Sequence, residues 1–266
     1  MYWIYDLPEW LLGLLFVGVF VGVAVVGAVL SRPAVRKSFA AQEGWREHVS
    51  ITLEAAFVFV GLLLALITLA AYDNFADARA KVATEASEVG TLYRDVSAYP
   101  QPQRGEFEAD LRRYVARVIE SDWPKQRRGV VPKGEPLPGR IQHELATFEP
   151  AAPGEDALHG ATLAQVNAWL KARRERMDVV IRGLPSVLWV VLVLGALVNI
   201  ALTWLLPVEE TKAHVVLSAA FAFVIALLLF VTASMDHPFR GNFSVSPEAF
   251  RVLQDDVFAS TSATTP

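Results

Sequence analysis

The side chains best able to do chemistry stand at the ends of long apolar blocks. Glu54 precedes one block, Asp73 and Asp77 follow it, and Asp236 and His237 follow another. Charged rings at the mouths of a pore bias which ions enter, and a histidine can change its charge near neutral pH. These five residues are therefore candidates for the charged mouths of an ion pathway. Ion pairing and capping at helix ends explain the same residues more simply.

Enzymatic chemistry finds little support in the sequence. The chain has no cysteine, which excludes disulfides, thiol nucleophiles and cysteine-ligated zinc. No HExxH, GxSxG, P-loop or GxGxxG motif occurs in a plausible setting. We therefore predict no catalytic residue, no metal site and no cofactor. His48 and His214 could ligate a haem across a helix bundle, which leaves a haem or metal enzyme as the least favoured class.

The composition narrows the class of protein further. The chain of 266 residues has 24 basic and 28 acidic side chains, a formal net charge of −4. This charge offers no general attraction to polyanions, so we expect no nucleic acid partner. Hydrophobic residues make up 53% of the chain and charged residues 20%, which excludes a disordered chain.

Four stretches contain no Asp, Glu, Lys or Arg: residues 10–31, 55–72, 183–208 and 215–235. A helix rises about 1.5 Å per residue, so about 20 residues cross the ~30 Å of hydrocarbon in a bilayer. Backbone amides in lipid must be paired within their own segment, so each stretch is predicted to be a helix. The first stretch lacks the basic start of a signal peptide, and we predict that it remains as a span.

These stretches divide the chain into four parts. Residues 1–72 are predicted to contain the first two spans, at about 10–31 and 53–72, joined by a basic short loop. Residues 73–182 are predicted to form a helical extramembrane region. Residues 183–235 are predicted to contain the last two spans, at about 184–206 and 214–235, and residues 236–266 form a tail. The expected fold class is all-α, a polytopic membrane protein with four transmembrane helices and a helical extramembrane bundle between spans 2 and 3. The basic residues of the short loops are Arg32, Arg36, Lys37, Arg46 and Lys212. By the positive-inside rule they favour short loops in the cytoplasm and both termini outside. The opposite orientation is favoured by the basic residues that precede the third span on the other face: Lys171, Arg173, Arg174, Arg176 and Arg182.

Three apolar stripes at helical spacing mark the middle region. They are Phe75, Val82, Val89, Leu92, Tyr93 and Val96; Phe107, Leu111, Tyr114, Val115, Val118 and Ile119; and Leu163, Val166, Leu170, Met177 and Ile181. The first stripe continues the second span and the third runs directly into the third span, which predicts long helices that leave the membrane. Residues 124–140 are rich in Pro and Gly and are predicted to form a basic loop.

Small residues and apolar residues suggest different roles for the spans. The small residues Gly18 and Gly22 in the first span, and Ser218, Ala222 and Ala226 in the fourth, allow close helix packing, which we expect within the chain rather than between copies. The second span offers apolar side chains that could gate a pore by dewetting. The candidate pore-lining residues are Phe57, Val60, Leu64 and Ile67.

A distinctive segment, DHPFRGNFSVSPEAF (residues 236–250), follows the fourth span. Pro238 is expected to stop the helix, Gly241 to allow a turn, and Ser246 with Pro247 to start a short amphipathic helix. This segment, which begins with Asp236 and His237 and includes Phe239, resembles the post-membrane motif of the bestrophin-like family of bacterial four-span membrane proteins. Residues 46–48 and 92–94 are weaker matches.

The resemblance implies a distant relation to bestrophins, pentameric anion channels whose pore is lined by the second span. This sequence departs from them at the calcium-clasp acidic run and at the pore-neck motif. No functional residue is therefore carried over from bestrophins, and the relation supports a channel by likeness of architecture.

These observations predict a homo-oligomeric ion channel in the bacterial inner membrane, a multi-pass protein with the lipid bilayer and inorganic ions as partners. Acidic mouths would favour cations, whereas the bestrophin relation implies anions, so ion selectivity stays open. The alternative is a non-conducting membrane sensor or scaffold. Long helices that continue out of the membrane support this alternative, and the lack of an output domain counts against it.

Overall fold

The structure is a computed structural model that describes residues 8–39, 45–132, 136–150, 153–206, 208–241 and 243–258. Within these residues every regular element is a helix and no strand occurs. The chain forms two compact units. The membrane unit comprises Met1–Asn74, Gly183–Asp236 and Gly241–Phe243, and the bundle unit comprises Phe75–Arg182, His237–Arg240 and Ser244–Pro266.

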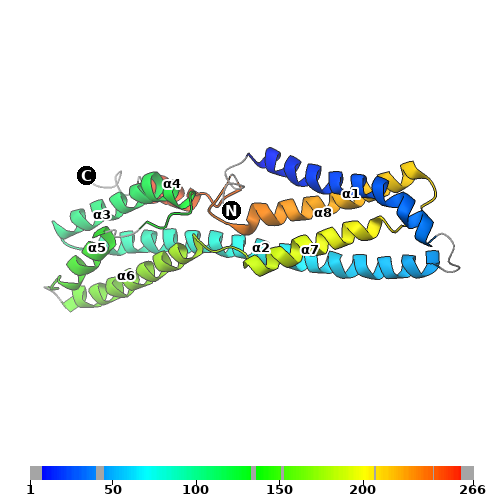
Figure 1. The fold of residues 1–266 in the computed structure, drawn as a ribbon. Coiled ribbons are helices and arrows are strands. Elements are labelled where there is room, and N and C mark those ends of the chain that lie inside the picture. Colours follow the sequence, from blue (N-terminus) through cyan, green and yellow to red (C-terminus); the bar gives the residue numbers. More distant parts are fainter. Residues whose placement is uncertain are drawn as a thin grey trace. The chain divides into compact units, whose positions relative to one another are not determined.

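The membrane unit contains the four predicted spans. They belong to α1 (Glu9–Phe39), the first part of α2 (Trp45–Val96), α7 (Ser186–Thr203) and α8 (Thr211–Asp236). All four are long and apolar enough to cross a membrane, as the stretches without charge predicted. α1 lies along α8 (Figure 1). The four spans share one apolar core, which includes Phe20, Ala24, Leu64, Ile67, Leu192, Ala196, Ala222, Ile225, Ala226 and Leu229.

Small residues allow close packing at some of the predicted positions in the membrane unit. Ser218, Ala222 and Ala226 are fully buried in α8. In α1 the close contacts are made at other glycines, because Gly13 faces the ring of Phe230 and the ring of Trp204 fills the space beside Gly27. A Cβ atom at Gly18 or Gly22 would meet nothing within 4 Å. The face of α1 that carries these two glycines therefore does not pack on another part of the described chain.

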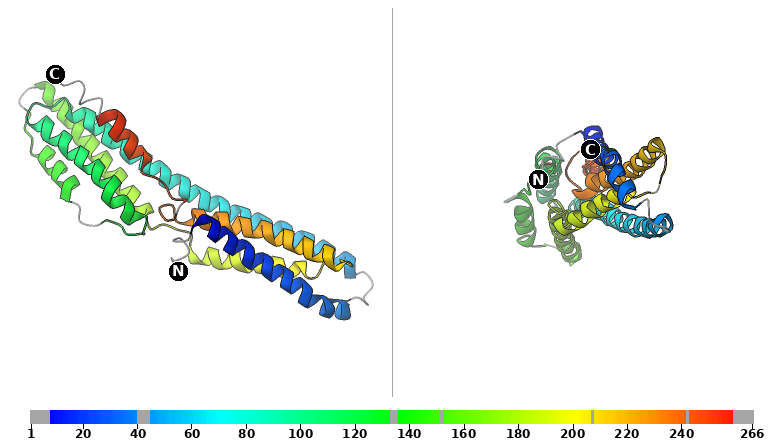
Figure 2. Two further views of the ribbon diagram at one scale, coloured as in Figure 1. Left: turned by 90° about the horizontal axis from the view of Figure 1, so that it is seen from above. Right: turned by 45° about the vertical axis from the view of Figure 1, so that its right-hand side comes forward.

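The bundle unit is a set of helices around one apolar core. It contains the second part of α2, α3 (Gln103–Arg117), η2 (Val118–Asp122), α4 (Trp123–Gln126), α5 (Pro136–Ala146), α6 (Pro153–Val179), α9 (Glu248–Val252) and η3 (Leu253–Phe258). The core takes in most of the three predicted stripes together with Trp123, Trp169, Phe239, Phe250 and Phe258. Figure 2 shows the tail helices α9 and η3 beside α2.

The prediction of continuous helices is confirmed for α2 and wrong for α6. α2 runs unbroken from Trp45 to Val96. α6 ends at Val179, and α7 begins only at Ser186, after Pro185. Proline disfavours helical geometry in the residue before it, which separates the two helices. Ile181 lies in this break and is 66% exposed, so it does not extend the third stripe.

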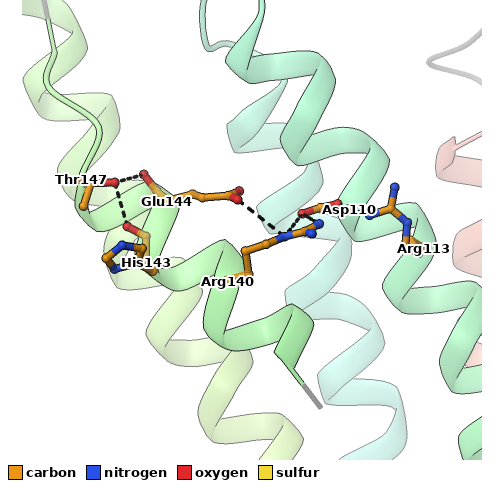
Figure 3. A network of polar contacts seen from close by, with 6 residues as sticks. All are labelled: Asp110, Arg113, Arg140, His143, Glu144 and Thr147. Carbon is orange, nitrogen blue, oxygen red and sulfur yellow. Dashed lines mark hydrogen bonds and ion pairs between the residues drawn. The ribbon is translucent and has the colours of Figure 1, made fainter.

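The region predicted as a basic loop, residues 124–140, contains α4 and the start of α5. α5 starts at Pro136, where proline suits the first turn of a helix. Arg140 donates from Nε to Oδ2 of Asp110 over 3.1 Å, and Arg113 donates to Oδ1 of the same carboxylate over 2.6 Å (Figure 3). Arg140 therefore joins α5 to α3 rather than extending from a solvated loop.

Candidate functional site

One face of α2 in the membrane unit is left uncovered by the rest of the protomer. Val58, Leu62 and Leu69 recur at helical spacing on this face and are 66%, 57% and 53% exposed. Ala65 lies on the same face and is also exposed. Exposed Glu54 precedes these residues in the helix, and exposed Asp73 follows them. The face is therefore an apolar stripe with a carboxylate at either end, and we call it the α2 stripe.

The candidate pore-lining residues predicted from the sequence lie beside this stripe or behind it. Leu64 and Ile67 are 2% and 5% exposed and belong to the core of the membrane unit. Phe57 packs on Phe221 of α8 with ring centroids 4.3 Å apart. Val60 is half-buried and lies 3.7 Å from the position of a Cβ atom built on Gly195. These four side chains face the neighbouring spans of their own protomer.

Of the five candidate mouth residues, two are exposed, two have carboxylates that pair with other groups of the protein, and His237 is half-buried. Glu54 and Asp73 are exposed. Oδ2 of Asp77 forms ion pairs with Nζ of Lys81 at 3.0 Å and with Nη1 of Arg182 at 3.3 Å. His237 is half-buried, and its carbonyl accepts the backbone N–H of Arg240 at 2.9 Å.

Asp236 is 2% exposed, at the last residue of α8. The backbone N–H of Leu184 donates to Oδ1 over 2.5 Å, and the indole N–H of Trp189 donates to Oδ2 over 3.0 Å. A carboxylate at a helix C-terminus opposes the helix dipole, and two donors offset this cost. Asp236 thus ties the end of α8 to the start of α7.

The two histidines considered for haem differ in what the structure shows. His214 is buried, and its Nε2 lies 2.9 Å from the carbonyl oxygen of Thr203. The side chain of His48 lies outside the described part of the structure. Among the residues that were described, no group of His, Cys, Asp and Glu is arranged to hold a metal ion.

The tail motif packs two of its three phenylalanines, Phe239 and Phe250, into the bundle unit. Phe239 and Phe250 are fully buried, with ring centroids 5.5 Å and 6.2 Å from that of Trp123. The indole N–H of Trp123 donates to the carbonyl of Val245 over 3.2 Å. The expected turn is present, because Gly241 has φ 74°. The short helix starts one residue later than predicted, at Glu248, with Pro247 as its N-cap and no side-chain capping bond.

A second contact fixes the tail motif to residues 127–130. Arg240 donates from Nη2 to the carbonyl of Arg128 over 3.1 Å, and its guanidinium lies over Gly129. Gly129 has φ 72°, a left-handed conformation that strains any residue with a side chain. Both the backbone and the guanidinium therefore require glycine at this position.

Gly129→Ala is expected to destabilise the bundle unit by about 1–2 kcal/mol, the cost of left-handed geometry for an L-residue. Gly139→Ala is the matched control, because Gly139 lies within α5 and a Cβ atom there meets nothing within 4 Å. This control should stabilise by about 0.5–1 kcal/mol. Thermal unfolding of the detergent-solubilised protein measures both. Equal midpoints of thermal unfolding for the two variants would contradict the requirement for glycine at position 129.

The bundle core also encloses a polar network that was not among the residues predicted from the sequence. Glu85 of α2 and Arg176 of α6 are both 0% exposed. Nε and Nη2 of Arg176 donate to the Glu85 carboxylate, the latter over 3.3 Å, and Tyr114 donates its hydroxyl to Oε1 of the same group. Nη1 of Arg176 donates to Gln126 over 2.9 Å. The ion pair is therefore buried and hydrogen-bonded on several sides.

Aromatic rings complete the surroundings of Arg176. Its guanidinium lies 5.7 Å from the ring centroid of Trp123 and 5.6 Å from that of Phe250. Burial acts to lower the pKa of Arg176, but the Glu85 carboxylate and Tyr114 outweigh it and raise the pKa above its ordinary value. Burial, with the nearby Glu85 charge, raises the pKa of Tyr114. Arg176 stays charged and the Tyr114 phenol stays protonated, so the network acts as a structural lock between α2, α6 and the tail.

A signal for this lock was present in the sequence. Glu85 stands between Val82 and Val89, on the buried face of the first stripe. Arg176 follows Trp169 by two turns, on the buried face of α6. Two opposite charges at core positions of two stripes predict a buried pair, because an unpaired charge there is too costly.

The fold and these contacts define an all-helical membrane protein with four spans, whose second span continues as a helix of a polar bundle completed by the C-terminal tail. A bestrophin-like domain matches residues 18–250. The chain therefore belongs to the bestrophin-like family. No curated protein matches its sequence.

Solved structures of a bacterial bestrophin homologue from Klebsiella pneumoniae share this fold. One point mutant superposes with a TM-score of 0.70 at 10% identity, covering 91% of this chain and 98% of that one. A second mutant gives 0.69 at 12% identity, covering 92% and 98%. A structure phased from zinc gives 0.67 at 12% identity, covering 93% and 98%. At these identities the likeness establishes the fold alone.

Proposed function

We propose that this protein is a homo-oligomeric ion channel of the bacterial inner membrane, with its pore along α2. The observation that carries the proposal is the α2 stripe, an exposed apolar face with Glu54 and Asp73 at its ends. Membership of the bestrophin-like family and the shared fold support it.

The α2 stripe suits a pore for a physical reason. When several copies surround one axis, an uncovered helix face on each copy can form the wall of the central passage. Val58, Leu62 and Leu69 would then contribute apolar rings, and such constrictions gate ion flow by dewetting. On this proposal the pore-lining set moves around the helix from Phe57, Val60, Leu64 and Ile67, which face neighbouring spans, to the residues of the stripe.

A sensor or scaffold is the second candidate function. The unbroken course of α2 from Trp45 to Val96 favours it, because one helix joins a membrane span to the bundle unit. The two functions differ in what purified protein does in a bilayer, so conductance separates them.

The test is conductance in planar bilayers for the wild type, Leu62→Ser and Leu69→Ser. Serine lowers the apolar barrier, so both variants should conduct severalfold more than the wild type or open more readily. Val216→Ser is the control, because Val216 is 65% exposed but belongs to α8. Serine at Phe57 or Val60 should have a smaller effect than serine in the stripe.

Two outcomes would count against the proposal. Unchanged conductance, gating and selectivity in both stripe variants would place the pore elsewhere. A folded wild type that never conducts under varied pH, calcium and voltage would favour the scaffold. Particle symmetry of the purified protein gives an independent check, since a channel requires a closed ring with an axial cavity.

A further inference from the structure

A groove of the bundle unit lies between α2 and the tail, with a volume of about 680 Å³. Its walls come from α2 on one side and from residues 244–257 on the other. Its apolar lining residues are Phe75, Val82, Ala83, Ala86, Val245, Ala249, Val252, Leu253 and Val257. Binding sites for small molecules are commonly grooves of this size with a mostly apolar lining and a few polar groups.

The tail runs parallel to α2 along this groove. A Cβ atom on Gly90 would lie 2.9 Å from Leu253, and further along both segments the ring of Phe258 lies 4.6 Å from that of Tyr93. The earlier tail residues, Ser244 and Ser246, therefore face the end of the groove that holds Arg79.

The two ends of the groove differ in charge. At one end Arg94 donates to Thr91 over 3.3 Å, beside Asp95, and the tail contributes Asp256 to the lining. At the other end Arg79 is exposed and makes no hydrogen bond or ion pair with the described part of the chain.

The acidic residue nearest to that end in the tail already has a partner. Glu248 pairs with Arg251 at 3.8 Å. The Arg79 end of the groove is therefore left with one uncompensated positive charge, at the edge of an apolar surface.

We propose that the groove binds a single-chain amphipathic carboxylate of the fatty-acid class. The planar guanidinium of Arg79 matches a carboxylate with two parallel N–H donors. The chain lies along the apolar lining toward Leu253, where hydrocarbon is removed from water. This site is separate from the α2 stripe, and its occupancy does not depend on whether the protein conducts ions.

The experiment titrates the full-length, detergent-purified protein with palmitate and counts bound molecules by native mass spectrometry. We expect one palmitate per chain. Arg79→Gln should weaken binding about tenfold, because a charge-assisted hydrogen bond is lost. Arg174→Gln, an exposed arginine of α6 outside the groove, should leave it unchanged.

A second pair of variants tests the apolar part of the groove. Ala83→Phe places a ring in the groove and should abolish binding, whereas Ala80→Phe, on an exposed position outside the lining, should not. Palmityl alcohol and acetate test the head and the chain separately, and each should bind much more weakly than palmitate. Equal binding of acetate would indicate a free-anion site, and equal binding by Arg79→Gln or Ala83→Phe would overturn the proposal. The absence of palmitate binding would also overturn the proposal. So would the finding that this groove binds a second copy of the chain and not palmitate.

Discussion

Replacing Arg176 with methionine is expected to destabilise the bundle unit by about 3–5 kcal/mol, because the substitution leaves the Glu85 carboxylate buried without its counter-charge. Both side chains are 0% exposed, so water cannot take the place of the guanidinium. Trp123 and Phe250 also lose the cation that lies near both of their rings. The free energy of unfolding, followed by tryptophan fluorescence in denaturant, measures the effect.

The double variant Glu85→Leu with Arg176→Met tests the cause. Replacing both members of a buried ion pair by apolar groups is often nearly neutral, so the double variant should regain most of the lost stability. The coupling energy of the double-mutant cycle then gives the strength of the pair. If the free energy of unfolding of Arg176→Met lies within about 0.5 kcal/mol of the wild-type value, the network does not stabilise the bundle unit.

The second large effect is expected for Asp236→Ala. This substitution removes the acceptor for the Leu184 amide and the Trp189 indole, both within the membrane unit. A hydrogen bond to a charged group contributes about 1.5–3 kcal/mol, and a buried donor left unpaired costs more than a lost contact. We expect a loss of about 3 kcal/mol, measured as the free energy of unfolding in detergent.

Asp73→Asn is the matched control for Asp236. Asp73 ends the second apolar stretch as Asp236 ends the fourth, but it is exposed. Its substitution should change stability by no more than about 0.5 kcal/mol. In conductance measurements the same variant should shift ion preference toward anions, since it removes a negative charge at the proposed mouth. Equal destabilisation by the two variants would contradict a structural role specific to Asp236.

The four spans could be predicted because lipid imposes one strong rule on the sequence. A charge-free run of suitable length must be a helix when no water is present to pair its backbone. The continuation of α2 beyond Asp73 was equally readable, since no proline occurs between Asp73 and the end of the helix at Val96. The end of α6 was missed because its apolar stripe was extended to Ile181, whereas the helix ends at Val179 and Pro185 marks the start of α7.

The exposed face of α2 could not be read in the same way. Leu62, Leu63 and Leu64 are consecutive, so apolar side chains surround the helix on all sides and no polar face marks the outside. Only packing separates them: Leu64 is 2% exposed, whereas Leu62 is 57% exposed. The choice of pore-lining candidates therefore required the positions of the neighbouring helices.

The tail has a consequence for the order in which the protein is made. Five tail residues, Phe239, Val245, Phe250, Leu253 and Phe258, complete a core whose other buried members lie within residues 75–182. During translation the ribosome adds these residues only after it has synthesised α7 and α8. Domains generally fold as units as they emerge, but this one lacks part of its core until the last two spans have been made. Phe250 can pack on Trp123 and near the Arg176 guanidinium only after α7 and α8 have been synthesised, so synthesis of the last two spans precedes closure of the bundle core.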